Sequence, residues 1–241
     1  MAATELWVCE LGRIGYREAL ALQERVRAAR QRESVPDTLL LLEHDPPVYT
    51  RGRRSAPGEL SMGEDWYAQR GIEIVQTDRG GKVTYHGPGQ LVGYPIVRVP
   101  DVVAYVRLLE RTLVDALARV GIEARARDAE GPAYTGVWVQ ERKIASIGVH
   151  LARGVTTHGF AVNVQERALE PFNWVVACGL PEVRMTAVES ERGDAVVSLE
   201  SIGALAADGL AAALGHTPRR VRRRALEERI GPTIGVGTLS A

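Results

Sequence analysis

The apolar positions of the chain repeat with two different periods, and these periods predict where helices and strands lie. Residues 16–33 and 101–120 carry apolar side chains every three to four positions, which is typical of a helix with one buried face. Residues 198–214 show the same spacing. Asp101 and Ser198 stand in the N-cap positions of the second and third helices, because their side chains can accept hydrogen bonds from the first free N–H groups.

Short apolar runs predict the strands. They lie at 5–9, 39–42 and 72–76, and the run at 39–42 is continuous rather than alternating. Three further runs within 136–164 are separated by short polar turns, which favours a strand meander. Helices mixed with strands in this way indicate an α/β or α+β fold, with mixed sheets and flanking helices.

The composition sets the domain count and excludes some partners. A length of 241 residues fits one domain, which we expect to span 1–241, with 216–241 as a basic C-terminal tail whose structure the pattern does not assign. Thirty basic and thirty acidic residues give a net charge of zero, which argues against nucleic-acid binding. The basic run at 219–224 either forms a solvated face or attracts an acidic partner protein.

Two cysteines, Cys9 and Cys178, are too few and too far apart to form a disulfide framework, so we expect free thiols in a reducing compartment. The N-terminus lacks the pattern of a signal peptide, and the chain has no apolar run of about 18 residues that could cross a membrane. A cytoplasmic protein without membrane partners is the expectation.

The densest group of unusual residues is the segment RGGKVTYHGPGQ at 79–90. Glycine lets a backbone approach a ligand closely, and such a loop exposes N–H groups that can hold a carbonyl or an anion. The spacings of phosphate-binding and dinucleotide-binding loops are absent. Two tight turns around a short strand would give the same composition.

Cys178 and Lys143 are the candidates for catalysis. A thiolate attacks thioesters well, but an ordinary thiol has a pKa of about 8.5 and needs a nearby base or cation. Lys143 could supply that charge and move protons. The simpler interpretation is that the cysteine is buried and structural and that the lysine is a solvated surface charge. His86 and His158 each precede a glycine, and we interpret them as pocket walls or hydrogen-bond donors, since no compact metal-ligand spacing is present.

These residues together resemble a known family. Residues 79–96, RGGKVTYHGPGQLVGYPI, resemble the signature of the octanoyl-[acyl-carrier-protein]:protein N-octanoyltransferases of lipoate biosynthesis. Four later segments agree with that family in order and spacing, so that the resemblance covers roughly residues 5–200: GVWV at 136–139, KIASIGVH at 143–150, THGFAVNV at 157–164 and ACG at 177–179.

The resemblance implies roles for particular residues. Cys178 would carry the acyl group as a thioester, and Lys143 would be its partner. The fold would be shared with the catalytic domains of biotin and lipoate protein ligases. The acyl-binding pocket would be formed by Arg79, Gly80, Gly81, Lys82, Val83, Thr84, Tyr85, His86, Ser146, Ile147, Gly148, Gly159, Phe160 and Ala161.

The resemblance also implies a reaction, namely the first step of endogenous protein lipoylation. The donor would be octanoyl-acyl carrier protein, and the acceptors would be lysines on the lipoyl domains of 2-oxoacid dehydrogenases and on the glycine cleavage H protein. A thioester is already activated, so neither ATP nor another cofactor is expected. Acyl carrier proteins are acidic, so Arg51, Arg53, Arg54 or the run at 219–224 are candidates to meet the carrier.

Two other functions remain open. An ATP-dependent lipoate or biotin ligase would share the fold but needs no cysteine, whereas the GPGQ after Tyr85-His86 and the Cys178-Gly179 pair favour the transferase. A non-catalytic acyl-binding protein would keep the glycine-lined pocket without any use for Cys178 and Lys143.

Overall fold

The continuous apolar run at 39–42 lies in β2 (Asp37–His44), a strand that is buried on both faces. Leu39 and Leu41 point into one core, while Leu40 and Leu42 point into another. Because successive side chains of a strand point to opposite faces, a strand covered on both sides contains no polar alternation. This strand therefore lies at the centre of a layered fold.

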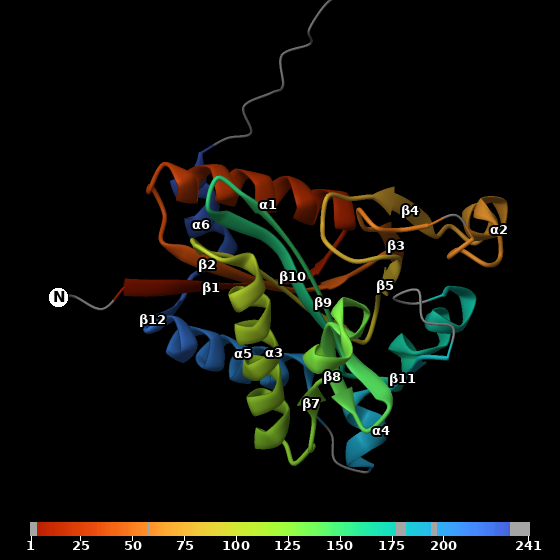
Figure 1. Cartoon of the computed structure of the whole chain (residues 1–241). Coiled ribbons are helices and arrows are strands. Elements are labelled where there is room, and N and C mark those ends of the chain that lie inside the picture. The colour runs from red at the N-terminus through yellow and green to blue at the C-terminus, as the bar shows by residue number, and fades with distance from the viewer. Residues whose placement is uncertain (1–3, 57, 177–181, 194–196, 232–241) are drawn as a thin grey trace, which may run out of the picture.

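The computed structural model describes residues 4–56, 58–176, 182–193 and 197–231. Within these residues, nine strands form one mixed sheet (Figure 1). β1 is parallel to both of its neighbours, and most other pairs are antiparallel, so the mixed sheet expected from the sequence is confirmed. The order is β12 (His216–Arg220), β1 (Thr4–Ile14), β2, β6 (Gln90–Ile96), β10 (Val155–Asn163), β9 (Arg142–Ala152), β8 (Gly136–Val139) and β7 (Arg125–Ala126), with β11 (Arg184–Met185) beside β9.

Helices cover both faces of this sheet. α1 (Tyr16–Gln31) and α6 (Arg223–Ile230) pack on one face, and α3 (Val102–Arg119) and α5 (Leu199–Leu214) pack on the other (Figure 1). The expected caps are present, since the Asp101 carboxylate accepts the first free N–H groups of α3 and the Ser198 hydroxyl accepts one of α5. Gly215 ends α5 in the left-handed conformation, with φ of 68°.

The strand meander expected within 136–164 is confirmed as β8, β9 and β10, which are antiparallel neighbours. The glycine-rich segment contains two strands that the sequence pattern did not separate. They are β5 (Thr84–His86) and β6, and a turn at 87–89 joins them. The turn carries the chain from a small side sheet into the main sheet.

The side sheet places the glycine-rich segment next to the core. Its strands are β4 (Glu73–Gln76), β3 (Val48–Arg51) and β5, and α2 (Glu64–Gln69) packs beside them. Tyr49, Tyr67 and Tyr85 form an aromatic cluster there with Phe172. The remaining short elements are α4 (Val188–Arg192) and turns of 3₁₀ helix at Asp128–Glu130, Pro132–Tyr134, Glu166–Ala168 and Glu170–Trp174.

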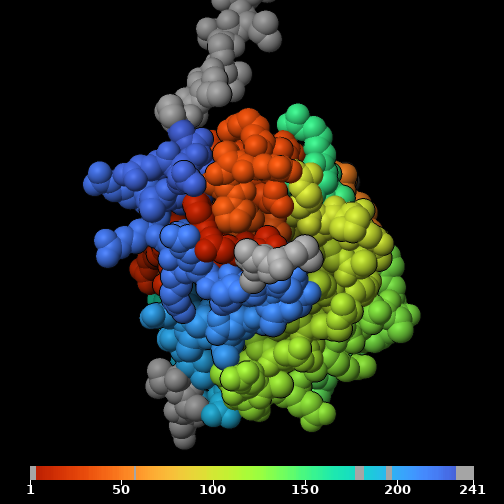
Figure 2. Space-filling view, turned by 90° about the vertical axis from the view of Figure 1, so that its left-hand side faces the viewer, coloured from red at the N-terminus to blue at the C-terminus, as the bar shows by residue number. Residues whose placement is uncertain are grey.

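The described part of the basic C-terminal segment is structured. β12 extends the main sheet beside β1, and α6 lies against α1 on the surface shown in Figure 2. Arginines of the basic run form ion pairs with nearby glutamates: Arg219 with Glu5, Arg220 with Glu10, Arg223 with Glu18 and Glu227, and Arg224 with Glu228. None of the helices in the described ranges is long and apolar enough to span a membrane.

Candidate functional site

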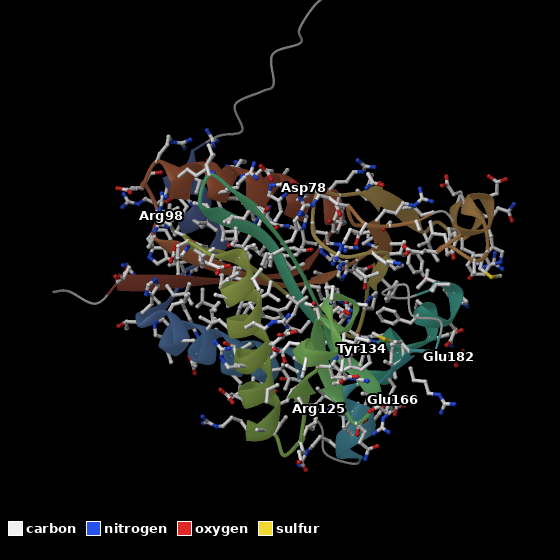
Figure 3. The ribbon with its side chains drawn as sticks, viewed as in Figure 1. Asp78, Arg98, Arg125, Tyr134, Glu166 and Glu182 are labelled. Carbon is white, nitrogen blue, oxygen red and sulfur yellow. The ribbon has the colours of Figure 1, made fainter. Side chains whose placement is uncertain are left out.

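A cavity of about 460 Å³ lies between the glycine-rich segment, β9, β10 and the start of α3. Two residues labelled in Figure 3 serve to name its two ends: Asp78, whose label overlaps α1 in this view, and Tyr134, near β8. Asp78 contacts the cavity residue His158, and Thr135, which follows Tyr134, is itself part of the wall. The cavity therefore crosses the sheet surface between these two ends.

Glycines let the glycine-rich segment lie directly on β9. The N–H of Gly80 donates to the carbonyl of Val149 at 3.0 Å. A Cβ at Gly148 would lie 2.9 Å from the carbonyl oxygen of Gly80, and one at Gly52 would lie 2.5 Å from that of Gly81. Any side chain at these positions would separate the backbones, so the glycines are needed for close packing at the cavity wall.

The structure brings together nearly all of the pocket residues expected from the sequence. Tyr85 is the exception, because strand alternation turns its ring into the aromatic cluster with Tyr49 and Phe172. The expected residues that line the cavity are Arg79, Gly80, Gly81, Lys82, Val83, Thr84, His86, Ser146, Ile147, Gly148, Gly159, Phe160 and Ala161.

Lys143 lies at the Tyr134 end of the cavity, and its residue is only 1% exposed. Its Nζ donates to the carbonyl of Thr135 at 2.8 Å and lies 5.2 Å from the centre of the Trp138 ring. A buried ammonium is costly unless such contacts compensate for the lost water. The side chain is thus held at a defined place in the wall and is not a solvated surface charge.

Cys178, the expected nucleophile, lies outside the described residues. The described chain before it ends at Val176, whose N–H donates to the carbonyl of Glu59 at 2.8 Å. After it, Met185 pairs with Lys143 between β11 and β9, and the N–H of Thr186 donates to the carbonyl of Lys143 at 2.9 Å. The chain that follows Cys178 therefore returns to the backbone of Lys143.

Three rings, those of Tyr16, His86 and Tyr94, form a polar wall at the other end of the cavity, and His44 contacts each of them from β2. Of these residues, the sequence had singled out only His86. Tyr16 stacks on His86, and the Nε2 of His44 lies 2.7 Å from the hydroxyl of Tyr94. Burial lowers the pKa of His44 to about 4 and raises that of Tyr16 to about 12. Burial also lowers the pKa of His86 well below its ordinary value, so the wall is uncharged near neutral pH.

His158 closes the cavity next to this wall. Its Nε2 lies 2.8 Å from a carboxylate oxygen of Asp78, and His150 contacts the same carboxylate at 3.1 Å. The hydrogen bond from His158 is the main reason that the pKa of Asp78 falls to about 2. No group of three or more His, Cys, Asp or Glu side chains in the described ranges could hold a metal ion.

Basic side chains surround the cavity. Arg53 and Arg54 are exposed, and the described residues hold no acidic partner within ion-pair distance of either. Lys82 pairs with Glu59 at 3.2 Å, and Arg107 pairs with the buried Glu110. The cations at this entrance favour an acidic ligand or partner.

Sequence reasoning missed several lining residues, and most gave little local signal. Tyr94 lies inside the 79–96 segment and could have been included on that ground. Tyr16 and Val106 occupy apolar positions of α1 and α3, where a core residue is the usual interpretation. Only the packing of those helices against the sheet assigns them to a cavity.

Comparisons with known proteins agree with this geometry. Residues 15–211 match the model of the lipoyl protein ligase A/B catalytic domain. The chain is 52% identical over 175 residues to an octanoyltransferase of Solibacter usitatus, a match that covers 71% of this chain and 77% of that protein.

Two solved structures show the shared fold. A lipoate protein ligase of T. acidophilum with bound lipoic acid superposes with a TM-score of 0.74, at 21% identity, over 94% of this chain and 92% of that chain. A biotin protein ligase of Aquifex aeolicus superposes with a TM-score of 0.50, at 12% identity, over 88% and 69% of the two chains. The expected likeness to the biotin and lipoate ligase fold is confirmed.

Proposed function

Because this chain belongs to the lipoyl protein ligase A/B catalytic domain family, and within it to the octanoyltransferases, we propose a specific route for its acyl transfer. The octanoyl group passes from an acyl carrier protein thioester to Cys178 and then to a lysine of a lipoyl domain. The observation that carries this proposal is the position of Lys143. Its side chain is buried in the cavity wall, and its backbone pairs with Met185 of β11, the strand that follows Cys178 in the sequence.

The cavity suits an acyl chain. Its volume of about 460 Å³ lies within the range of small-molecule sites, about 300–1,000 Å³. Val83, Ile147 and Phe160 supply apolar surface, while the buried ring of His86 carries no charge near neutral pH. We propose that the residues named from the resemblance, apart from Tyr85, contact the octanoyl group here. One methylene in such a pocket changes binding by about 1–3 kcal/mol, so chain-length preference is graded.

The first half of the reaction makes an acyl-enzyme. The thiolate of Cys178 attacks the thioester carbonyl carbon, a new C–S bond forms, and the bond to the pantetheine sulfur breaks. The departing sulfur takes up a proton. Lys143 stabilises the thiolate electrostatically and moves protons between the leaving and entering groups.

The second half transfers the acyl group to the acceptor. The uncharged ε-amine of the acceptor lysine attacks the acyl-enzyme, an amide forms, and the thiol of Cys178 is released. The acceptors are the lipoyl domains of 2-oxoacid dehydrogenases and the glycine cleavage H protein. A nucleophilic thiol must stay reduced, which favours action in the cytoplasm.

The intact mass of the protein after brief exposure to octanoyl-acyl carrier protein tests this route. The wild type gains one octanoyl group that hydroxylamine removes, and Cys178→Ala gains none. Cys9→Ala is the matched control, because Cys9 is buried in β1 and burial raises its pKa to about 11. It should acylate as the wild type does.

Two results would overturn the route. Octanoyl transfer to a lipoyl domain by Cys178→Ala would show direct transfer without an acyl-enzyme. Product formation from free octanoate only when ATP is added would show a ligase instead.

Lys143→Met should slow acylation at neutral pH by at least about tenfold, because losing a charge contact worth about 1.4 kcal/mol lowers a rate or equilibrium constant tenfold.

A further inference from the structure

A row of buried amide side chains runs from the cavity wall to the strand beside Lys143. His86 Nδ1 lies 2.7 Å from Gln90 Oε1, Gln90 Nε2 lies 2.9 Å from Asn163 Oδ1, and Asn163 Nδ2 lies 3.0 Å from the carbonyl oxygen of Thr186. His86, Gln90 and Asn163 are each at most 7% exposed. Neither Gln90 nor Asn163 lines the cavity, so neither contacts an acyl chain there.

The far end of this row determines its direction. The carbonyl oxygen of Thr186 can only accept, so Asn163 presents its NH₂ group to it and its oxygen to Gln90. Gln90 must then donate to Asn163 and present its own oxygen to His86. This leaves His86 Nδ1 as the donor, and in a neutral imidazole Nε2 is then an acceptor.

Local sequence and sheet register make this row possible. The turn at 87–89 folds the chain back so that Gln90 meets the ring of His86, and Gly89 has φ of 89°. Antiparallel pairing of β6 with β10 places Asn163 opposite Gln90. The GPGQ part of the signature thus has a role separate from the pocket itself.

We propose that Gln90 and Asn163 are positioning residues, which fix the proton of His86 on Nδ1. They also connect the polar wall by hydrogen bonds to Thr186, whose backbone contacts Lys143. One chain of hydrogen bonds then connects the two ends of the cavity. The effect on turnover rests on the proposed function, whereas the position of the proton on His86 does not.

The groups around His86 favour the same neutral state. Arg79 and His158 face it from the cavity, His44 faces it from β2 with ring centres 5.8 Å apart, and Tyr16 stacks on it from α1. Desolvation by burial is the main reason that the pKa of His86 falls well below its ordinary value, and the positive charge of Arg79 would also repel an added proton. The hydrogen bond to Gln90 acts in the opposite direction but does not outweigh them.

The first test reads the tautomer directly. Long-range ¹H–¹⁵N spectra of the protein with labelled histidines report which nitrogen of each of the five imidazoles is protonated, and the spectrum of His86→Gln assigns His86. His86 should be neutral with its proton on Nδ1, and Gln90→Met should release the proton into a mixture of tautomers. A proton on Nε2 in the wild type, or an unchanged signal in Gln90→Met, would overturn the proposal.

The second test uses the pH dependence of Asn163→Asp. The introduced carboxylate, when ionised, can still accept from Gln90 but cannot donate to Thr186, so kcat should fall about tenfold, the effect of about one lost buried hydrogen bond. Once protonated, the introduced carboxyl has one donor and one acceptor, which is the arrangement that asparagine uses here. The ratio of the variant's kcat to the wild-type kcat should therefore rise as the pH falls, which a general loss of folding would not produce.

Asn173→Asp provides the matched control, because it makes the same substitution at an exposed site in the chain. It should keep the wild-type pH profile. A pH-independent loss in Asn163→Asp would contradict the positioning role. If the wild type transferred no octanoyl group but His86 showed the Nδ1 tautomer, the proposed function would fail while the assignment of the proton would stand.

Discussion

At the scale of single residues, His158 is the most unusual backbone position in the cavity wall. Its φ is 57°, a left-handed value that residues with side chains rarely adopt, and it occurs within β10. Its N–H donates to Gln23 Oε1 at 2.7 Å, and its ring is held by Asp78. Such a conformation persists only when surrounding contacts maintain it, which is a feature of functional sites.

Asp78 should therefore make folding sensitive to acid. Its pKa in the folded state is about 2, below the value of about 3.9 for an unfolded chain. A lowered carboxyl pKa contributes stability above the unfolded value, and this contribution is lost as the pH falls from about 4 towards 2. The free energy of unfolding of Asp78→Asn should fall less steeply than that of the wild type over the acid range.

Urea unfolding between about pH 5 and pH 3 measures this slope. Asp208→Asn, at an exposed position of α5, removes the same charge and is the control that should keep the wild-type slope. Equal slopes in Asp78→Asn and the wild type would show that the contact between Asp78 and His158 does not contribute to stability.

At the scale of elements, the β8–β9 hairpin sets the position of Lys143. β8 begins at Gly136, with φ of 135°, and its N–H donates to the buried carboxylate of Glu110 on α3 at 2.9 Å. A Cβ at Gly136 would lie 2.4 Å from the carbonyl oxygen of Ala145 and 2.7 Å from Cε of Lys143. The helix, the start of the strand and the lysine are thus fixed together.

Gly136→Ala should lower both stability and octanoyl transfer. The positive φ costs about 1–2 kcal/mol for a residue with a Cβ, and overpacking against the Ala145 carbonyl and Lys143 adds about 1–3 kcal/mol. Gly131→Ala is the matched control, because Gly131 also has positive φ, 105°, but open space around it. Thermal unfolding and transfer assays on both variants separate backbone strain from overpacking against the Ala145 carbonyl and Lys143, and equal losses of activity would contradict the prediction.

At the scale of the whole molecule, the basic residues fall into two groups with different environments. The run at 219–224 lies in β12 and α6, and β12 is separated from β10 by β1, β2 and β6. Its ion pairs offset much of its charge. Arg53 and Arg54, in contrast, stand at the cavity, while Arg51 pairs with Glu64. Among the basic residues considered from the sequence, Arg53 and Arg54 are thus the best placed to meet the acidic carrier protein that we propose as the donor.

Charge reversal at Arg53 and Arg54 should raise KM for octanoyl-acyl carrier protein, by roughly tenfold at low salt and less at high salt, because exposed pairs contribute about 0.2–1 kcal/mol each and are screened. Arg222→Glu with Arg224→Glu is the control on α6 and its N-terminus, and should leave KM unchanged. KM for octanoyl-pantetheine, which lacks the carrier, should change little in either double variant. A larger effect of the α6 pair would move the carrier site to the C-terminal face.

Much of the fold follows from local patterns, because helix periodicity, caps and apolar runs act over a few residues. The helices at 16–33, 101–120 and 198–214 and the meander at 136–164 are found where the sequence predicts them, to within a few residues. β12 and α6 were not predicted, since a run of arginines gives neither strand nor helix periodicity. Those elements are stabilised by β1, α1 and partner glutamates distant in sequence.

The sequence by itself determined the family, the reaction class and the residues of the glycine-rich segment, because these depend on residue types at fixed spacing along the chain. Only the tertiary structure decided which side chains share a cavity. It turned Tyr85 away by strand alternation, brought Tyr16, His44 and Tyr94 to His86 and buried Lys143 behind Gly136. It also joined His86 to Thr186 through Gln90 and Asn163, because sheet register aligns residues that lie far apart in the sequence.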